Sequence, residues 1–155
     1  GLVAAIETTP DAYRGGSLHC VFQVDSMFQA PYALVGADIS DSKIAAVGKS
    51  WFDFTPMTAF TFMAKGSGTV FVQLTCMPVG ASKDFVVYEI PVTLSPVWEK
   101  HTLRAAEIPY ALATTLPWSS GNKAVSNINF LAKKNADLWI DEITIEGMTL
   151  TDFVK

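Results

Sequence analysis

The sequence contains few of the side chains that catalytic and metal sites use. Among its 155 residues are two histidines, His19 and His101, and two cysteines, Cys20 and Cys76. The cysteines lack the Cys-x-x-Cys spacing of a metal or redox pair, so we expect two free, buried thiols; the alternative, a disulfide, requires an oxidising compartment. No GxSxG, HExxH, Walker or GxGxxG motif occurs. The sequence therefore predicts a protein that is not an enzyme.

Positive charge and long apolar runs are also scarce. Lysines and arginines number 11 and are scattered, acidic residues number 15, and the net charge is -4. A nucleic-acid groove or an anionic-membrane surface requires a basic stripe, and a membrane-spanning helix requires about 18 consecutive apolar residues. We therefore expect no nucleic-acid partner and no membrane span. The first residues do not combine a charged with an apolar segment, so we expect any signal peptide to have been removed.

Hydrophobic residues are abundant but occur in short alternating runs. They make up 50% of the chain and charged residues 17%, which is typical of a globular protein, and the length suits one domain over residues 1–155. Turns rich in glycine, proline and serine separate the runs at intervals of about 8–12 residues. Apolar and polar residues alternate in seven segments: Leu18–Asp25, Ala59–Lys65, Thr69–Cys76, Phe85–Leu94, Lys100–Ala105, Ser126–Ala132 and Leu138–Ile145.

A period of two with frequent turns predicts an all-β fold, an antiparallel sandwich or barrel. In the last segment the alternation is kept only if a β-bulge lies near Asp141 and Glu142. Almost no helix is expected. The segment Ala105–Leu112 could form one helical turn, and Pro109 within it prevents a longer helix.

Three segments occur in a characteristic order. The first, residues 53–68, contains Asp53-Phe54-Thr55 and then Phe-Thr-Phe-Met-Ala-Lys-Gly-Ser-Gly. The second, residues 95–103, reads Ser-Pro-Val-Trp-Glu-Lys-His-Thr-Leu. The third joins Val-Ser-Asn-Ile-Asn-Phe at 125–130 with Leu-Trp-Ile-Asp-Glu-Ile-Thr-Ile at 138–145. Together they resemble the strands of jelly-roll carbohydrate-binding modules, the galactose-binding-like β-sandwiches attached to cellulases, xylanases and mixed-linkage glucanases. The resemblance covers roughly residues 15–148.

The resemblance implies a two-sheet jelly roll with a non-catalytic function. Such a module binds a polysaccharide chain, of the β-glucan, cellulose or xylan type, and targets a covalently attached glycoside hydrolase to its substrate. It would be secreted or lie at the cell surface. Two alternatives stay open: a small jelly-roll hydrolase or lyase that uses a carboxylate such as Glu89 or Asp25, and an adhesion or interaction domain of the same fold.

Two tryptophans are candidates for stacking on a sugar ring. Trp139 is flanked by Leu138 and Ile140, so if these face inward Trp139 faces out, and either a sugar or a covering loop explains its exposure. Trp118 lies in a loop beside Pro117, where it serves either as a ligand platform or as a plug at one end of the sandwich. For the other two, Trp98 and Trp51, burial is the better interpretation.

Sugar recognition also needs polar side chains around the ring edge. Asn127 and Asn129 flank Ile128, so both are expected to point outward, and Gln73 is outward by the same alternation. The sequence predicts that these amides bind hydroxyl groups of a sugar that stacks on Trp139 or Trp118. The wider set of outward polar residues adds His19, Gln23 and Asp25, and ordinary solvated sheet surface is the alternative for each residue.

Asp141 has a separate role implied by the resemblance. The corresponding aspartate of the closing strand in such modules helps to bind a structural calcium ion, together with backbone carbonyls and an acidic residue near the N-terminus. Here the acidic residues near the N-terminus are Glu7 and Asp11. Because calcium takes six to eight oxygen ligands, one aspartate does not define the site. We therefore expect calcium, where it binds, to be structural and to use Asp141.

Overall fold

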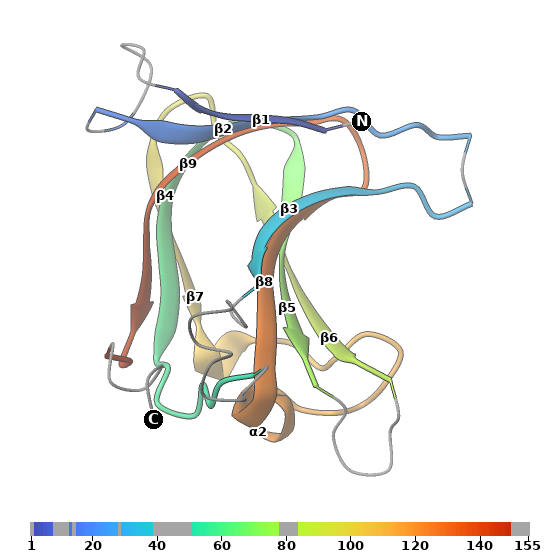
Figure 1. Cartoon of the computed structure of the whole chain (residues 1–155), viewed down its shortest axis with the longest axis vertical. Helices are drawn as coiled ribbons and strands as arrows, with labels where there is room; N and C mark the ends of the chain where they lie inside the picture. Colours follow the sequence, from blue (N-terminus) through green and yellow to red (C-terminus); the bar gives the residue numbers. More distant parts are fainter. Residues whose placement is uncertain are drawn as a thin grey trace.

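Two antiparallel sheets pack face to face in the computed structural model of the chain, which describes residues 2–7, 13, 15–27, 29–38, 51–77 and 84–149. The five-stranded sheet has the order β1-β2-β9-β4-β7 and the four-stranded sheet the order β3-β8-β5-β6 (Figure 1). The strands are β1 (Leu2–Glu7), β2 (Ser17–Phe22), β3 (Ala33–Asp38), β4 (Ala59–Ser67), β5 (Thr69–Cys76), β6 (Val86–Thr93), β7 (Glu99–Arg104), β8 (Val125–Ala132) and β9 (Ala136–Glu146).

The predicted all-β, two-sheet jelly roll is confirmed. Each of the seven alternating segments overlaps one strand, and β5 has the predicted bounds. The sequence did not indicate β1 and β3. Helix is limited to the single turns η1 (Ala105–Glu107), α2 (Trp118–Gly121) and η2 (Asn122–Ala124) in the described part of the chain. None of the described helices is long and apolar enough to cross a membrane.

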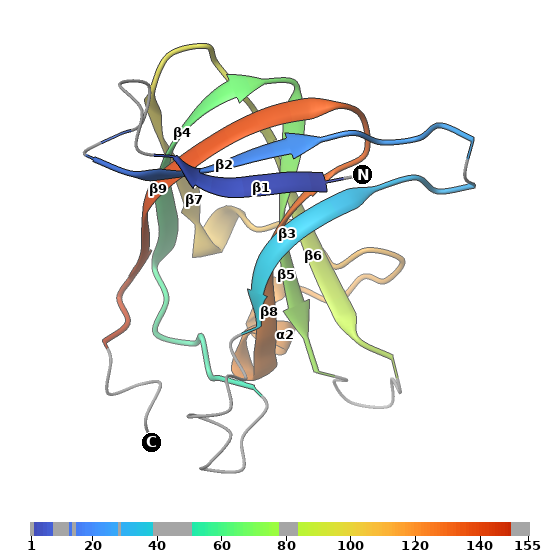
Figure 2. The same ribbon diagram turned by 45° about the horizontal axis from the view of Figure 1, so that its top comes forward.

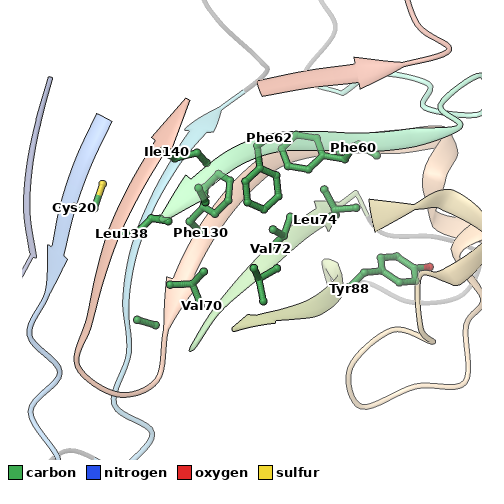
Figure 3. Packing of buried hydrophobic residues seen from close by; sticks show 14 of the residues in the cluster. Cys20, Phe60, Phe62, Val70, Val72, Leu74, Tyr88, Phe130, Leu138 and Ile140 are labelled. Carbon is green, nitrogen blue, oxygen red and sulfur yellow. The ribbon is translucent and has the colours of Figure 1, made fainter. Parts of the chain in front are cut away.

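Aromatic and aliphatic side chains from both sheets fill the space between them. Phe60 and Phe62 of β4 meet Phe130 of β8, and the rings of Phe62 and Phe130 pack edge to face with centroids 5.3 Å apart (Figure 3). Such an arrangement places the positive ring edge against the negative ring face. Leu74 and Leu138 complete this layer and are almost fully buried. The core thus holds both sheets rigidly and leaves their outer faces free to present other side chains.

The closing strand β9 contains the predicted β-bulge. Glu142 has a φ of 46°, and the pairing of β9 with β4 shifts register between Thr61 and Met63. Ile145 packs against the core, whereas Ile143 is 52% exposed. The bulge therefore preserves the alternation of the strand without burying each of its apolar residues.

The two cysteines are free and buried, as predicted. Cys20 lies on β2 in one sheet and Cys76 on β5 in the other. Burial raises the pKa of the Cys20 thiol to about 11 and that of Cys76 to about 12. Because the thiolate is the reactive form, both side chains act as small hydrophobic residues at neutral pH.

His101 on β7 is a partly buried imidazole. Its ring stacks on Phe62 with centroids 5.2 Å apart, and its Nε2 atom is buried without a hydrogen-bond partner among the described residues. Desolvation lowers the pKa of His101 below its ordinary value, and the nearby Glu99 opposes this shift only in part. The folded protein therefore favours the neutral imidazole.

Acid is expected to destabilise the protein through His101. As the pH falls through about 6.5 the unfolded chain takes up a proton at this residue, whereas the folded chain does so only at lower pH, so stability is lost below that point. His101→Phe removes the titration and keeps a ring against Phe62. Thermal melting at about pH 8 and about pH 5 is expected to show a smaller loss in the variant than in the parent. An equal loss in both proteins would contradict the prediction.

Candidate functional site

The outer face of the four-stranded sheet brings the predicted amide side chains into register. β3 pairs with β8, β8 with β5, and β5 with β6, so the outward positions form rows across the four strands. We call this surface the four-strand face. Its rows are Leu34, Leu131, Phe71 and Pro91; then Gly36, Asn129, Gln73 and Glu89; then Asp38, Asn127, Thr75 and Val87. An apolar row therefore lies directly beside a polar one.

Hydrogen bonds join the side chains of the polar row. Asn129 Nδ2 donates to Gln73 Oε1 over 3.1 Å, and Gln73 Nε2 donates to Glu89 Oε1 over 3.2 Å. The other carboxylate oxygen of Glu89 accepts from Lys133 Nζ, which also lies 4.4 Å from the centroid of the Phe71 ring. Because the Glu89 side chain is only 7% exposed, the ion pair offsets the cost of burying its charge. The row is thus held in a fixed arrangement before any ligand arrives.

Gly36 makes room for the Asn129 side chain. It lies opposite Asn129 in the pairing of β3 with β8. A Cβ atom at Gly36 would overlap Asn129 Oδ1 and would lie 2.6 Å from the backbone oxygen of Ile128. A side chain at this position would therefore push Asn129 out of the polar row or β3 away from β8.

An open groove of about 560 Å³ runs over the four-strand face. The connection between β2 and β3, which projects from the sandwich in Figure 2, supplies one wall through its residues 30–32. Tyr32 on this wall is 61% exposed. The sheet supplies Leu34, Gln73, Glu89 and Leu131, and Lys133, directly after β8, completes the lining. The groove therefore combines an exposed aromatic ring with fixed hydrogen-bonding groups.

The predicted single site, with Trp139 beside the amides, is wrong. Trp139 lies on β9 in the five-stranded sheet, whereas Gln73, Asn127 and Asn129 lie on β5 and β8 in the four-stranded sheet. The two sets point outward from opposite sides of the sandwich. Asn127 takes part in a separate contact, since Ser126 Oγ donates to its Oδ1 atom over 2.9 Å.

Trp139 does project from its sheet, because its neighbours Leu138 and Ile140 are buried. The imidazole of His19 stacks on its ring at 4.0 Å and 14°, and Lys65 Nζ lies 4.9 Å from its centroid. His19 and Lys65 are its register partners on the two neighbouring strands, so they flank the ring from opposite sides. A sugar ring would have to displace one of them to stack on Trp139.

Trp118 is a core residue, which corrects its prediction as a loop platform. It begins the helical turn α2 and is only 6% exposed. Its ring packs edge-on against Tyr88, with centroids 5.1 Å apart and an angle of 88° between the planes. The other two tryptophans, for which burial was the better interpretation, are more exposed than expected. Trp51 is 38% exposed, and Trp98 lies against Lys65 on the outer side of the five-stranded sheet.

Several solved structures with the same architecture are carbohydrate-binding modules. A family 11 module of a cellulosomal cellulase from Clostridium thermocellum superposes with a TM-score of 0.70 at 12% identity, over 96% of this chain and 82% of that chain. The same family in complex with a β-1,3-1,4-mixed-linked tetrasaccharide gives 0.66 at 11% identity, over 95% and 83%. A family 30 module gives 0.63 at 15% identity, over 95% and 75%. The chain has the fold of these modules. No protein-family model and no curated protein matches its sequence.

Sequence reasoning missed the aromatic residue of the groove. Tyr32 directly precedes β3. Because β3 consists mostly of small residues, this part of the sequence shows no alternation of polar and apolar residues that would indicate the direction of the Tyr32 side chain. The ion pair of Glu89 with Lys133 was also missed as a feature of the site. The parity of β6 places Glu89 on the same side as Val87 and Pro91, but only the pairing of β6 with β5 sets it beside Gln73.

The calcium site at Asp141 stays a prediction. Ser17 Oγ donates to Asp141 Oδ2 over 3.1 Å, and the Glu142 N–H donates to Asp141 Oδ1 over 2.6 Å. Among the described residues no group of three or more histidine, cysteine or acidic side chains gathers to hold a metal. Glu7 at the end of β1 pairs with Ser17 of β2, the residue that contacts Asp141. Asp11 lies outside the described residues.

Melting curves test this prediction. Calcium that binds only the folded protein stabilises it by mass action, so millimolar calcium is expected to raise the melting temperature of the parent above its value in chelator. Asp141→Ala is expected to show no such difference. Identical melting temperatures of the parent in calcium and in chelator would remove the prediction.

Proposed function

We propose that the protein is a non-catalytic module that binds a polysaccharide chain of the β-glucan or xylan type in the groove of the four-strand face. The observation that carries the proposal is the polar row Asn129–Gln73–Glu89 beside the exposed ring of Tyr32. The shared fold with carbohydrate-binding modules supports the same conclusion.

The two parts of the groove suit the two surfaces of a sugar. A pyranose ring has an apolar C–H face, which can lie against an aromatic ring, and a rim of hydroxyl groups, which donate and accept hydrogen bonds. Tyr32 offers the ring, while Gln73 and Glu89 offer amide and carboxylate groups at the floor. Because these groups are already held by one another, little side-chain entropy is lost when a ligand binds.

The lining of the groove favours binding over hydrolysis. A glycosidase needs two carboxyl groups about 5–9.5 Å apart across the scissile bond. The described lining contains one carboxylate, Glu89, which is buried and paired with Lys133. Asp25, the other carboxylate considered for catalysis, accepts a hydrogen bond from the Met27 N–H at 2.9 Å and so caps a turn. A hydrolase or lyase remains the alternative that the experiment below must exclude.

The proposal includes a biological setting. We propose that the module is secreted or displayed at the cell surface and is joined to a catalytic domain of a polysaccharide-degrading enzyme. Binding to the polymer would then raise the local concentration of that domain at its substrate.

A panel of soluble polysaccharides tests the function. In affinity electrophoresis the protein is expected to be retarded by mixed-linkage β-glucan or xylan, and Gln73→Ala to be retarded less. The same incubations, analysed for new reducing ends, are expected to show none. Retardation by no polysaccharide would refute carbohydrate binding and favour the interaction-domain alternative. Release of oligosaccharides would show instead that the protein is an enzyme.

A further inference from the structure

The charged side chains in the groove of the four-strand face are paired with each other. Among the described residues of its lining, Glu89 and Lys133 are the two that carry charge. The Lys133 ammonium donates to Glu89 Oε2, and the Glu89 side chain is 7% exposed, whereas that of Lys133 is 47% exposed. The pair therefore brings no net charge to the groove. Its negative member is covered, and its positive member is within reach of a ligand.

Glu89 is held in place from two sides. Its Oε1 atom accepts a hydrogen bond from Gln73 Nε2 at 3.2 Å, and Gln73 Oε1 in turn accepts one from Asn129 Nδ2 at 3.1 Å. Glu89 also stands directly opposite Gln73 in the pairing of β5 with β6. A movement of the Glu89 side chain toward a ligand would break the polar row. The carboxylate is therefore fixed when a ligand binds.

Lys133 is held less firmly, but a second contact keeps it in the groove. It directly follows β8, and its ammonium lies 4.4 Å from the centroid of the Phe71 ring. A cation over an aromatic ring is attracted by the negative charge of the ring face. If its bond to Glu89 were lost, the ammonium would still be attracted to Phe71, in the lining that Lys133 shares with Tyr32.

A ligand carboxylate in this groove would compete with Glu89 for Lys133. The covered charge of Glu89 would then lose its cation and would lie near a second negative charge. Removing one partner of a buried ion pair is strongly unfavourable, because the remaining charge has lost its water without gaining a partner. A hydroxyl group can donate and accept hydrogen bonds without separating the pair. The pair therefore acts by disfavouring acidic ligands, which is one of the two ways to achieve specificity.

We propose that the Glu89–Lys133 pair determines the charge class of the ligand: the groove selects neutral polysaccharides and rejects chains that carry carboxylate groups, such as those rich in uronates. This proposal rests on the binding of a polysaccharide on the four-strand face and adds a selectivity to it. The source of the rejection is the covered carboxylate of Glu89, and the net charge of -4 on the whole chain is a separate effect.

Two derivatives of one polymer test the proposal. The soluble polysaccharide that the parent binds best is substituted with carboxymethyl or with hydroxyethyl groups to the same degree, which is set so that the parent still binds the hydroxyethyl derivative. The substituents are similar in size and differ in charge. Calorimetry at about 1 M salt, where the Debye length is about 3 Å, screens the repulsion from the protein as a whole. The parent is expected to prefer the hydroxyethyl derivative by about tenfold or more.

Glu89→Gln and Lys133→Met are expected to change this preference in opposite directions. Glu89→Gln keeps an acceptor for Gln73 and frees the ammonium, so the preference is expected to fall about tenfold. Lys133→Met leaves the Glu89 carboxylate alone, so the preference is expected to rise. The ratio of the two affinities is the readout, and a loss of binding common to both derivatives cancels in it. Glu107→Gln, which removes a negative charge from a side chain 70% exposed in η1, is the control and is expected to keep the ratio of the parent.

Failure of this proposal differs from failure of the proposed function. If the parent binds no polysaccharide, both are refuted. If the parent binds the two derivatives equally, or if Glu89→Gln keeps the ratio of the parent, polysaccharide binding stands and the role of the pair is refuted. An equal change in Glu107→Gln would also refute it, because net charge would then explain the effect. Melting curves check that each variant is folded. If Glu89→Gln does not fold, Lys133→Met decides, and an unchanged ratio in that variant overturns the proposal.

Discussion

Tyr32→Ala is expected to weaken the binding of soluble β-glucan or xylan about thirtyfold, because loss of a central aromatic anchor costs at least about 2 kcal/mol. Its melting temperature is expected to stay close to that of the parent. The ring is 61% exposed and stands on a connection outside the buried core, so little packing is lost with it. Isothermal calorimetry on the polymer that the panel selects, with melting curves alongside, measures both effects.

Trp139→Ala is the matched comparison, since Trp139 is an aromatic residue on the opposite side of the sandwich. Its ring is flanked by His19 and Lys65, so its loss is expected to leave polymer affinity unchanged. A thirtyfold loss in Trp139→Ala together with full binding by Tyr32→Ala would place the site on the five-stranded sheet. It would also restore the sequence-based prediction for Trp139.

The alternation of polar and apolar residues predicted side-chain direction well. Within β5 it correctly placed Gln73 outward between Val72 and Leu74, and within β8 it placed Asn127 and Asn129 together. Direction within a strand is a local property, because successive side chains point to opposite faces. The two-sheet fold follows from the same pattern, since each strand has one apolar side to bury.

The membership of each strand in a sheet was not predictable in the same way. Trp139 is outward on β9, as Gln73 is on β5, and both segments have the same period of two. Which of them share a face depends on pairing between residues far apart in the sequence, such as β2 with β9 and β5 with β8. Loop structure was equally hidden: Trp118 follows a proline, as many exposed residues do, but a helical turn brings its ring against Tyr88.

Gly36→Ala is expected to destabilise the protein by about 1–3 kcal/mol, the usual cost of overpacking. Elsewhere in a strand the same change would favour folding, because glycine loses more backbone entropy than alanine and has no side chain to pack. At this position the new methyl group would overlap Asn129 Oδ1 and lie 2.6 Å from the Ile128 backbone oxygen. Asn129 would lose its bond to Gln73, so polymer binding is expected to fall about tenfold as well.

The double variant Gly36→Ala, Asn129→Ala divides this effect between the side chain and the backbone. Removing the Asn129 amide relieves one contact but leaves the approach to the Ile128 oxygen, so the melting temperature is expected to recover only in part. Polymer affinity is not expected to recover, because the amide that bonds Gln73 is then absent. If Gly36→Ala were more stable than the parent, the close approach of β3 to β8 would be contradicted. If it also bound the polymer equally well, the role of the polar row in binding would be contradicted.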